Sequence, residues 1–188
     1  MNGQNKYFIR GENVSLKYGM HKSGPYNTLK QIVESLISAD ISHSVINPTT
    51  KNIKLYLLKW INMDEFKEFR VFVHNKKITA ISQQNCYQIN RLLENKTNLE
   101  IELIVHNWIG IITDFFEFEI VDKIVGSNYS MDIVLLNDDK PYFIEINSFG
   151  KEYAAGSALF TWVDEKGENN DIMYGKMSGV YFRYTCSK

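Results

Sequence analysis

The sequence predicts an α+β protein made of two lobes, and three stretches of the chain carry that prediction. Residues 26–37 place apolar side chains at helical spacing, whereas residues 68–82 and 129–147 each read as two short strands joined by a polar turn. Strand pairs grouped apart from helices are typical of α+β folds. We therefore expect a small N-terminal lobe over residues 1–58 and a larger C-terminal lobe over residues 59–188.

Composition narrows the class of protein. The chain has 188 residues, of which 44% are hydrophobic and 13% aromatic, which suits a packed core. A formal net charge of −1 provides no general attraction for nucleic acid or for an anionic membrane. Two distant cysteines, Cys86 and Cys186, argue against a disulfide scaffold or a zinc ribbon. The polar N-terminus resembles no secretory signal and no apolar run reaches membrane-spanning length, so we expect a cytoplasmic protein.

Short strands frame the expected small lobe. Tyr7–Ile9 and Val14–Lys17 are predicted as strands on either side of a turn-like break, and Ser42–Ile46 as a third before the turn Asn47–Thr50. Ile53–Ile61 is predicted as the next strand, and it ends in Lys59, Trp60 and Ile61.

One helix is expected between these strands. Apolar side chains recur at helical spacing from Tyr26 to Ile37, and Thr28 with Gln31 matches a capping box. We expect this helix to end near Ala39, so that the strands and the helix together form the small lobe.

The larger lobe begins with a predicted hairpin, Glu68–Val73 and Ile78–Ser82, that turns at Asn75 and Lys76. Alternation along the first strand separates an apolar face from a face that includes charged side chains. The apolar face carries Phe69, Val71 and Val73, and the other carries Glu68, Arg70 and Phe72. Further along, the sequence predicts a mostly helical stretch from Tyr87 to Phe118, a strand at Glu119–Lys123, a polar mobile stretch at Asp164–Gly175 and a closing strand at Val180–Thr185.

The second hairpin, residues 129–147, carries the candidate metal ligands. If it closes symmetrically about Asp138 and Asp139, Asp132 lies across from Glu145, with Phe143 and Asn147 on the same face as Glu145. Opposed like charges cost up to about 1 kcal/mol, so neutralising both acids is expected to keep the fold and to raise stability by up to that amount. A hard divalent cation held by the carboxylates and the amide oxygen would reverse the penalty. The alternative is an exposed hairpin whose acids face water.

The order of these parts resembles the ATP-grasp superfamily, and within it the cell division cycle protein 123 family. The resemblance covers about residues 14–165 and consists of six short motifs in sequence order. They are Lys59-Trp60, Glu68-Phe69-Arg70, Ala80-Ile81-Ser82-Gln83, Asp132, Glu145-Ile146-Asn147 and Leu159-Phe160-Thr161-Trp162.

This resemblance implies an ATP-grasp fold in which ATP and Mg²⁺ bind in a cleft between two α+β lobes. It implies that Lys17 and Arg70 contact the phosphates, and that the backbone around Lys59, Trp60 and Ile61 contacts the adenine. It also implies that three side chains hold magnesium, namely Asp132, Glu145 and Asn147. Two positions depart from the family pattern: Glu145 stands where aspartate is usual and keeps the charge, whereas Gln84 stands where an arginine is usual and removes a cation.

The resemblance leaves two functions open. The favoured one is a chaperone-type assembly factor that acts on a protein partner, translation initiation factor 2-like by family resemblance. The alternative is an ADP-forming carboxylate–amine ligase that acts through an acyl-phosphate on a peptide or amino-acid acceptor, with Lys22, Arg70 and the loop Ser148–Lys151 as the nearest groups to stabilise it. A binding module that has lost ATP is a third class, and the retained acids and Asn147 argue against it. No membrane and no nucleic-acid partner is expected.

Overall fold

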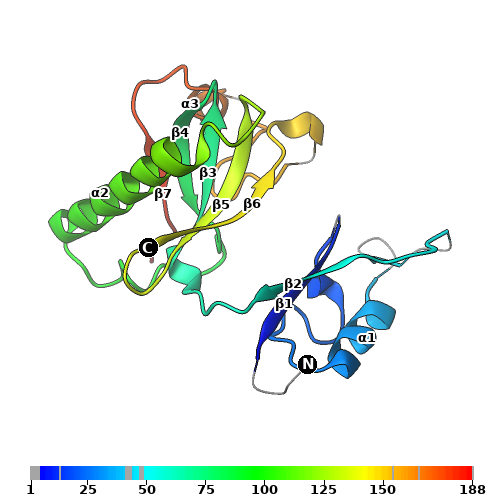
Figure 1. The fold of residues 1–188 in the computed structure, drawn as a ribbon. Helices are drawn as coiled ribbons and strands as arrows, with labels where there is room; N and C mark the ends of the chain where they lie inside the picture. Colours follow the sequence, from blue (N-terminus) through cyan, green and yellow to red (C-terminus); the bar gives the residue numbers. More distant parts are fainter. Residues whose placement is uncertain are drawn as a thin grey trace. The chain divides into compact units, whose positions relative to one another are not determined.

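The structure is a computed structural model, and the chain divides into two compact units, Met1–Asn62 and Met63–Lys188 (Figure 1). It describes residues 5–12, 14–40, 44–46, 49–153, 155–164 and 166–187. The predicted strand at Ser42–Ile46 and the predicted turn at Asn47–Thr50 lie partly outside these residues. The lobe limit predicted after residue 58 falls within the strand β2 (Leu55–Lys59).

The first unit is built on a two-stranded antiparallel sheet. In it β1 (Tyr7–Gly11) pairs with β2, with Tyr7 opposite Lys59 and Gly11 opposite Leu55. The predicted strand 53–61 is therefore shorter, and Trp60 and Ile61 follow its end. A small core of four buried side chains joins the sheet to the helix: Ile9, Leu16, Tyr26 and Ile32.

Helix α1 (Leu29–Ser38) confirms the predicted helix and its capping box. The Thr28 hydroxyl accepts a hydrogen bond from the Gln31 amide (3.3 Å), and the Gln31 side chain accepts one from the Thr28 amide (3.2 Å). Ala39 is the C-cap, as expected.

The strand predicted at Val14–Lys17 is wrong, because residues Leu16–Tyr18 form a single 3₁₀ turn, η1. Leu16 is buried, and its carbonyl accepts a hydrogen bond from the amide of Gly19 (2.9 Å). A Cβ atom at Gly19 would overlap the backbone of Ser35 in α1. The close approach to the helix thus turns the chain where a strand is predicted, and Lys17 lies exposed on that turn.

The second unit holds a five-stranded sheet in the order β6-β5-β3-β4-β7. Its strands are β3 (Glu68–His74), β4 (Lys77–Gln83), β5 (Tyr129–Leu135), β6 (Pro141–Asn147) and β7 (Tyr181–Arg183). Both predicted hairpins and the closing strand are confirmed, and β7 runs parallel to β4. Asn75 and Lys76 have φ angles of 50° and 58°, so both turn residues are left-handed, as a two-residue hairpin turn requires.

Helix α2 (Asn98–Phe115) covers one face of this sheet (Figure 1). Phe69, Val71 and Val73 of β3 point into the core beneath it, which confirms the predicted apolar face. Trp108 and Ile112 are the helix residues buried in that core. In the described ranges, neither α2 nor another helix is long and apolar enough to cross a membrane.

The limits predicted for this helix are wrong at both ends. Thr97 caps α2 through a reciprocal box with Glu100, so the helix starts eleven residues later than predicted, after a series of turns. The buried Asn90 side chain stabilises those turns, since its amide nitrogen donates to the carbonyl oxygen of Phe66 (3.1 Å). At the other end a π-helical turn, η4 (Phe116–Ile120), continues α2 where the strand Glu119–Lys123 is predicted.

The second face of the sheet is covered in part by the C-terminal segments. Phe72 and Ala80 pack there against Phe160 and Trp162, and the ring centroids of Phe72 and Trp162 are 5.7 Å apart. Within the mobile stretch predicted at Asp164–Gly175, residues Glu168–Met173 instead form the helix α3. Its residues Ile172 and Met173 are buried in this second core, and the Thr79 hydroxyl donates a hydrogen bond to the Met173 carbonyl (2.8 Å).

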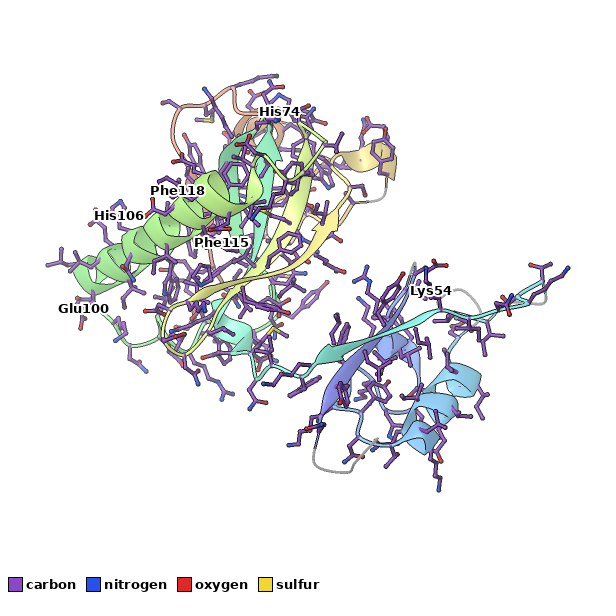
Figure 2. The ribbon with its side chains drawn as sticks, in the orientation of Figure 1. Lys54, His74, Glu100, His106, Phe115 and Phe118 are labelled. Atoms are coloured by element: carbon purple, nitrogen blue, oxygen red, sulfur yellow. The ribbon has the colours of Figure 1, made fainter. Side chains whose placement is uncertain are left out.

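Two phenylalanines of the second unit provide a test of the main core. Phe69 is fully buried beside the rings of Trp108 and Phe182, whereas Phe118 is 81% exposed on η4 (Figure 2). Phe69→Ala should lower the free energy of unfolding by about 3–5 kcal/mol, and Phe118→Ala should change it by less than about 0.5 kcal/mol. Urea denaturation followed by tryptophan fluorescence measures both, and similar losses in the two variants would contradict this core.

Candidate functional site

A row of charged and polar side chains crosses three neighbouring strands on the sheet face opposite α2. Arg70 of β3 is paired with Asp132 of β5, and Asp132 is paired with Glu145 of β6. One step along, Asn147 is paired with Ser130. The predicted opposition of Asp132 and Glu145 is thus confirmed, and the predicted face of β3 brings Arg70 to the same place.

A β-bulge in β6 produces this pairing. Near the turn the ladder pairs Ile133 with Phe143, while the next pair is Asp132 with Glu145, so Ile144 has no partner. The hairpin is therefore not symmetric about Asp138 and Asp139, and the extra residue restores the predicted partner of Asp132. The bulge also turns Phe143 to the other face, where it packs against the core under α2. The prediction that Phe143 shares the face of Glu145 is wrong for this reason.

Arg70 and Asp132 form a buried bidentate ion pair. Arg70 Nε donates to Asp132 Oδ1 (2.9 Å) and Arg70 Nη2 donates to Asp132 Oδ2 (2.8 Å). The two residues are 9% and 3% exposed. The amide nitrogen of Asn147 also donates to Asp132 Oδ2 (3.1 Å), so three hydrogen bonds converge on one carboxylate.

Arg70 sits among negative charges that keep it ionised. Burial alone would lower the pKa of the Arg70 guanidinium. The hydrogen bond and charge of Asp132, together with the charges of Glu145 and Glu68, outweigh burial and raise that pKa. The repulsion expected between the two acids is therefore offset by an internal cation. Neutralising both acids is therefore not expected to raise the stability of the protein.

A loop backbone covers the guanidinium. A Cβ atom at Gly156 would overlap Arg70 Nη1, the one guanidinium nitrogen that makes neither bond to Asp132. Two hydrogen bonds fix this segment: Ser82 Oγ accepts from the Leu159 amide (3.0 Å), and the Trp162 indole donates to the Ala155 carbonyl (2.8 Å). The Ala80–Gln83 and Leu159–Trp162 motifs thus meet beside the ion pair. Sequence reasoning missed Gly156, since an isolated loop glycine carries no signal of what lies above it.

The donor atoms of this site suit magnesium. Asp132 and Glu145 supply carboxylate oxygens, and Asn147 supplies an amide oxygen if its amide group turns by 180°. Mg²⁺ is commonly bound by one or two carboxylates together with waters and phosphate oxygens. Within the described ranges, no group of three or more His, Cys, Asp or Glu side chains is placed to hold a metal. The protein oxygens therefore fit an ion whose remaining ligands come from water and phosphate.

The other predicted nucleotide contacts belong to the first unit. Lys59 and Trp60 line a hollow of about 400 Å³, together with Asn5, Lys6, Tyr7 and Asn62. The Trp60 backbone amide already donates to the Lys6 carbonyl (2.9 Å), and its indole donates to Asn62 (2.9 Å). An adenine bound at this strand end would therefore use backbone groups other than the Trp60 amide. Neither Lys17 nor Ile61 lines this hollow, and the Lys17 ammonium lies 5.5 Å from the Tyr18 ring centroid.

Gln84 lies at the start of the loop after β4. Its backbone amide donates to the Glu68 carbonyl (2.9 Å), which extends the pairing of β3 and β4 by one bond. Its side-chain oxygen is buried and has no hydrogen-bond partner among the described residues. The position that usually carries a cation in the family therefore presents here an acceptor beside the strand of Arg70.

The burial of the ion pair predicts a stability effect opposite in sign to that of simple charge repulsion. Removing one partner of a buried pair costs about 3–5 kcal/mol, so Asp132→Asn should lower the free energy of unfolding by about 3 kcal/mol. Asp171→Asn is the matched control, because it breaks an exposed pair with Lys176 (2.7 Å) whose loss should cost less than about 1 kcal/mol. Urea denaturation compares them, and an Asp132→Asn protein as stable as the parent would contradict the role of this pair.

The D123 family model matches residues 27–184. A translation initiation factor eIF2 assembly protein of Candida albicans is 31% identical over 132 residues, which are 66% of this chain and 34% of that protein. The cell division cycle protein 123 of Yarrowia lipolytica is 30% identical over 118 residues, 61% of this chain and 28% of that protein. The matched region is thus about a third of the length of these relatives.

A solved structure shares the fold. Cdc123 from Schizosaccharomyces pombe superposes with a TM-score of 0.65 over 95% of this chain and 72% of that chain, at 18% sequence identity. The resemblance to the cell division cycle protein 123 family is confirmed, whereas the wider ATP-grasp assignment stays a prediction. Because the family model spans well over half of the sequence, the chain belongs to the D123 family.

Proposed function

We propose that this chain is an ATP-grasp assembly factor that binds Mg²⁺ and ATP and acts on a translation initiation factor 2-like protein partner. The observation that carries the nucleotide part is the row formed by Arg70, Asp132, Glu145 and Asn147 on one sheet face. The names of relatives support the partner, since those from Candida albicans and Lodderomyces elongisporus are translation initiation factor eIF2 assembly proteins.

Burying this row of charged side chains costs free energy of folding. A buried ion pair is often no more stable than well-packed apolar side chains of similar volume. The opposite face of the same strands is packed with apolar side chains such as Phe69 and Met131, so these strands can be covered by apolar packing alone. Charged groups retained in the middle of its second face therefore favour a binding role over a structural one.

Each residue then has a role matched to its chemistry. Mg²⁺ held by Asp132, Glu145 and Asn147 would neutralise the charge of the phosphate oxygens that share it. The planar guanidinium of Arg70 suits bidentate bonds to phosphate oxygens as well as to a carboxylate. In the first unit, the flexible Lys17 ammonium is proposed for the phosphates, and the backbone at Lys59, Trp60 and Ile61 for the adenine.

Assembly is preferred to ligation on the basis of the relatives and of Gln84. A ligase must stabilise an acyl-phosphate and its tetrahedral successor with positioned donors, and Gln84 removes one cation that the family usually has there. An assembly factor needs nucleotide to favour one conformation of the protein, and turnover is then secondary. The alternative is the ADP-forming ligase, which differs from an assembly factor in releasing ADP only when an acceptor is present.

The magnesium assignment is tested with Glu145→Gln, because this change removes one acid of the row and leaves both partners of the Arg70–Asp132 ion pair in place. Losing one charged ligand should weaken ATP binding in Mg²⁺ about tenfold or more, with little change in EDTA. Glu117→Gln, an exposed residue of η4, is the matched control and should bind as the parent does. Calorimetric titration with ATP measures the affinities, and undiminished Mg²⁺-dependent binding by Glu145→Gln would remove this residue from the site.

The partner assignment is tested by assembly of purified eIF2 subunits from Candida albicans, with that organism's assembly protein as the positive control. Mg²⁺ and ATP should increase the yield of assembled factor obtained with this chain, without sustained ADP release, and Glu145→Gln should remove the increase. ADP release is followed in parallel with amino acids and peptides added. Sustained release that requires such an acceptor, and that Glu145→Gln abolishes, would replace this proposal with the ligase.

A further inference from the structure

We propose that Arg70 is an internal counter-ion of Asp132, and that Gly156, which has no side chain, leaves room for the Arg70 guanidinium. Arg70 would keep Asp132 from binding a free divalent cation until a polyphosphate binds the guanidinium and draws it away. Mg²⁺ and nucleotide would then bind as a pair and not one after the other. This inference rests on the proposed function, and it adds to it a positioning residue and a coupling between metal binding and nucleotide binding.

Asp132 already accepts hydrogen bonds at both of its carboxylate oxygens. Both carboxylate oxygens accept hydrogen bonds from Arg70, and Oδ2 accepts a further one from Asn147. A cation approaching Asp132 would have to displace donors that are directed at it. It would also approach a fixed positive charge, and the two repel more strongly in this buried place than in water.

Polyphosphate, unlike a free cation, can bind the guanidinium of Arg70. The bidentate geometry that Arg70 offers to a carboxylate is the one it offers to phosphate oxygens. Phosphate that takes the guanidinium leaves Asp132 with a net negative charge beside Glu145, and this pair of acids then favours a divalent ion. Nucleotide and metal therefore favour each other's binding, and the coupling is reciprocal.

Gly156 leaves room for the guanidinium of Arg70. Arg70 uses Nε and Nη2 for Asp132, and its third nitrogen, Nη1, lies where a side chain at residue 156 would begin. The φ angle of Gly156 is outside the left-handed region, so an alanine is compatible with the backbone. An added methyl group would push on the end of a flexible side chain and rotate the guanidinium away from Asp132.

The test uses the full chain and Mn²⁺ as the probe, with free Mn²⁺ counted by electron paramagnetic resonance. Without nucleotide, the parent protein should bind Mn²⁺ weakly, and Gly156→Ala should bind it about tenfold more tightly, because a charge-assisted contact to the ligand is lost. Arg70→Lys, which keeps the charge but loses the bidentate geometry, should also bind Mn²⁺ more tightly than the parent. Gly110→Ala on α2 is the control, since a Cβ there meets no atom within 4 Å, and it should behave as the parent.

The coupling is measured by repeating the Mn²⁺ titration with ATP and subtracting the Mn²⁺ that ATP binds in the absence of protein. ATP should raise the Mn²⁺ affinity of the parent strongly, and the factor should fall about tenfold in Gly156→Ala. A gain of metal affinity is not what damage to the fold produces, so a merely structural role of Gly156 would not give this result.

The outcomes separate this inference from the proposed function. If the parent binds ATP with Mn²⁺, but Gly156→Ala and Arg70→Lys bind free Mn²⁺ no more tightly than it does, the counter-ion inference is overturned and the nucleotide site stands. If the variants gain Mn²⁺ affinity while no protein binds ATP, the counter-ion is supported and the nucleotide proposal fails. If neither gain nor ATP binding is seen, both are overturned.

Discussion

The ion pair between Arg70 and Asp132 joins the two strands at the centre of the second unit, and several neighbouring features depend on it. A buried guanidinium needs an opposite charge at hydrogen-bond distance, and strand pairing supplies one directly across the ladder. The same guanidinium requires a residue without a side chain above it, which Gly156 provides. Charge is thus placed on the middle of a sheet face that is otherwise covered by aromatic packing around Phe72.

Local signals account for what the sequence predicts correctly. The helix α1 starts where Thr28 and Gln31 cap it, and the β3–β4 hairpin turns where Asn75 and Lys76 accept left-handed backbone. Alternation along β3 assigns Phe69 and Arg70 to opposite faces, since successive side chains of a strand point to opposite sides. These features depend on residues a few positions apart, so their spacing in the sequence is sufficient to predict them.

Long-range contacts account for the rest. Asn90 holds the turns before α2 through a bond to Phe66, and α3 is ordered because Ile172 and Met173 are buried under the sheet. Neither contact produces a pattern among neighbouring residues, so the sequence predicts a helix at the first and a mobile stretch at the second. The partner of Arg70 is 62 positions away in sequence, so alternation gives its face but not the residue it meets. The bulge at Ile144 likewise appears only when β5 pairs with β6. It places Glu145 opposite Asp132 although the hairpin is not symmetric about Asp138 and Asp139.

An internal cation in the proposed metal site affects both stability and binding. Asp132 and Glu145 lie across one ladder and would repel each other without a nearby positive charge, which Arg70 supplies from the other side of Asp132. A ligand that takes Arg70 removes that compensation, and the site then gains stability only if a second positive charge replaces it. Nucleotide phosphates accompanied by a divalent ion meet both requirements together, because the phosphates bind the guanidinium and the ion binds the acids. The arrangement in which Arg70 compensates the two acids is thus the one that we propose favours a metal–polyphosphate pair over either component alone.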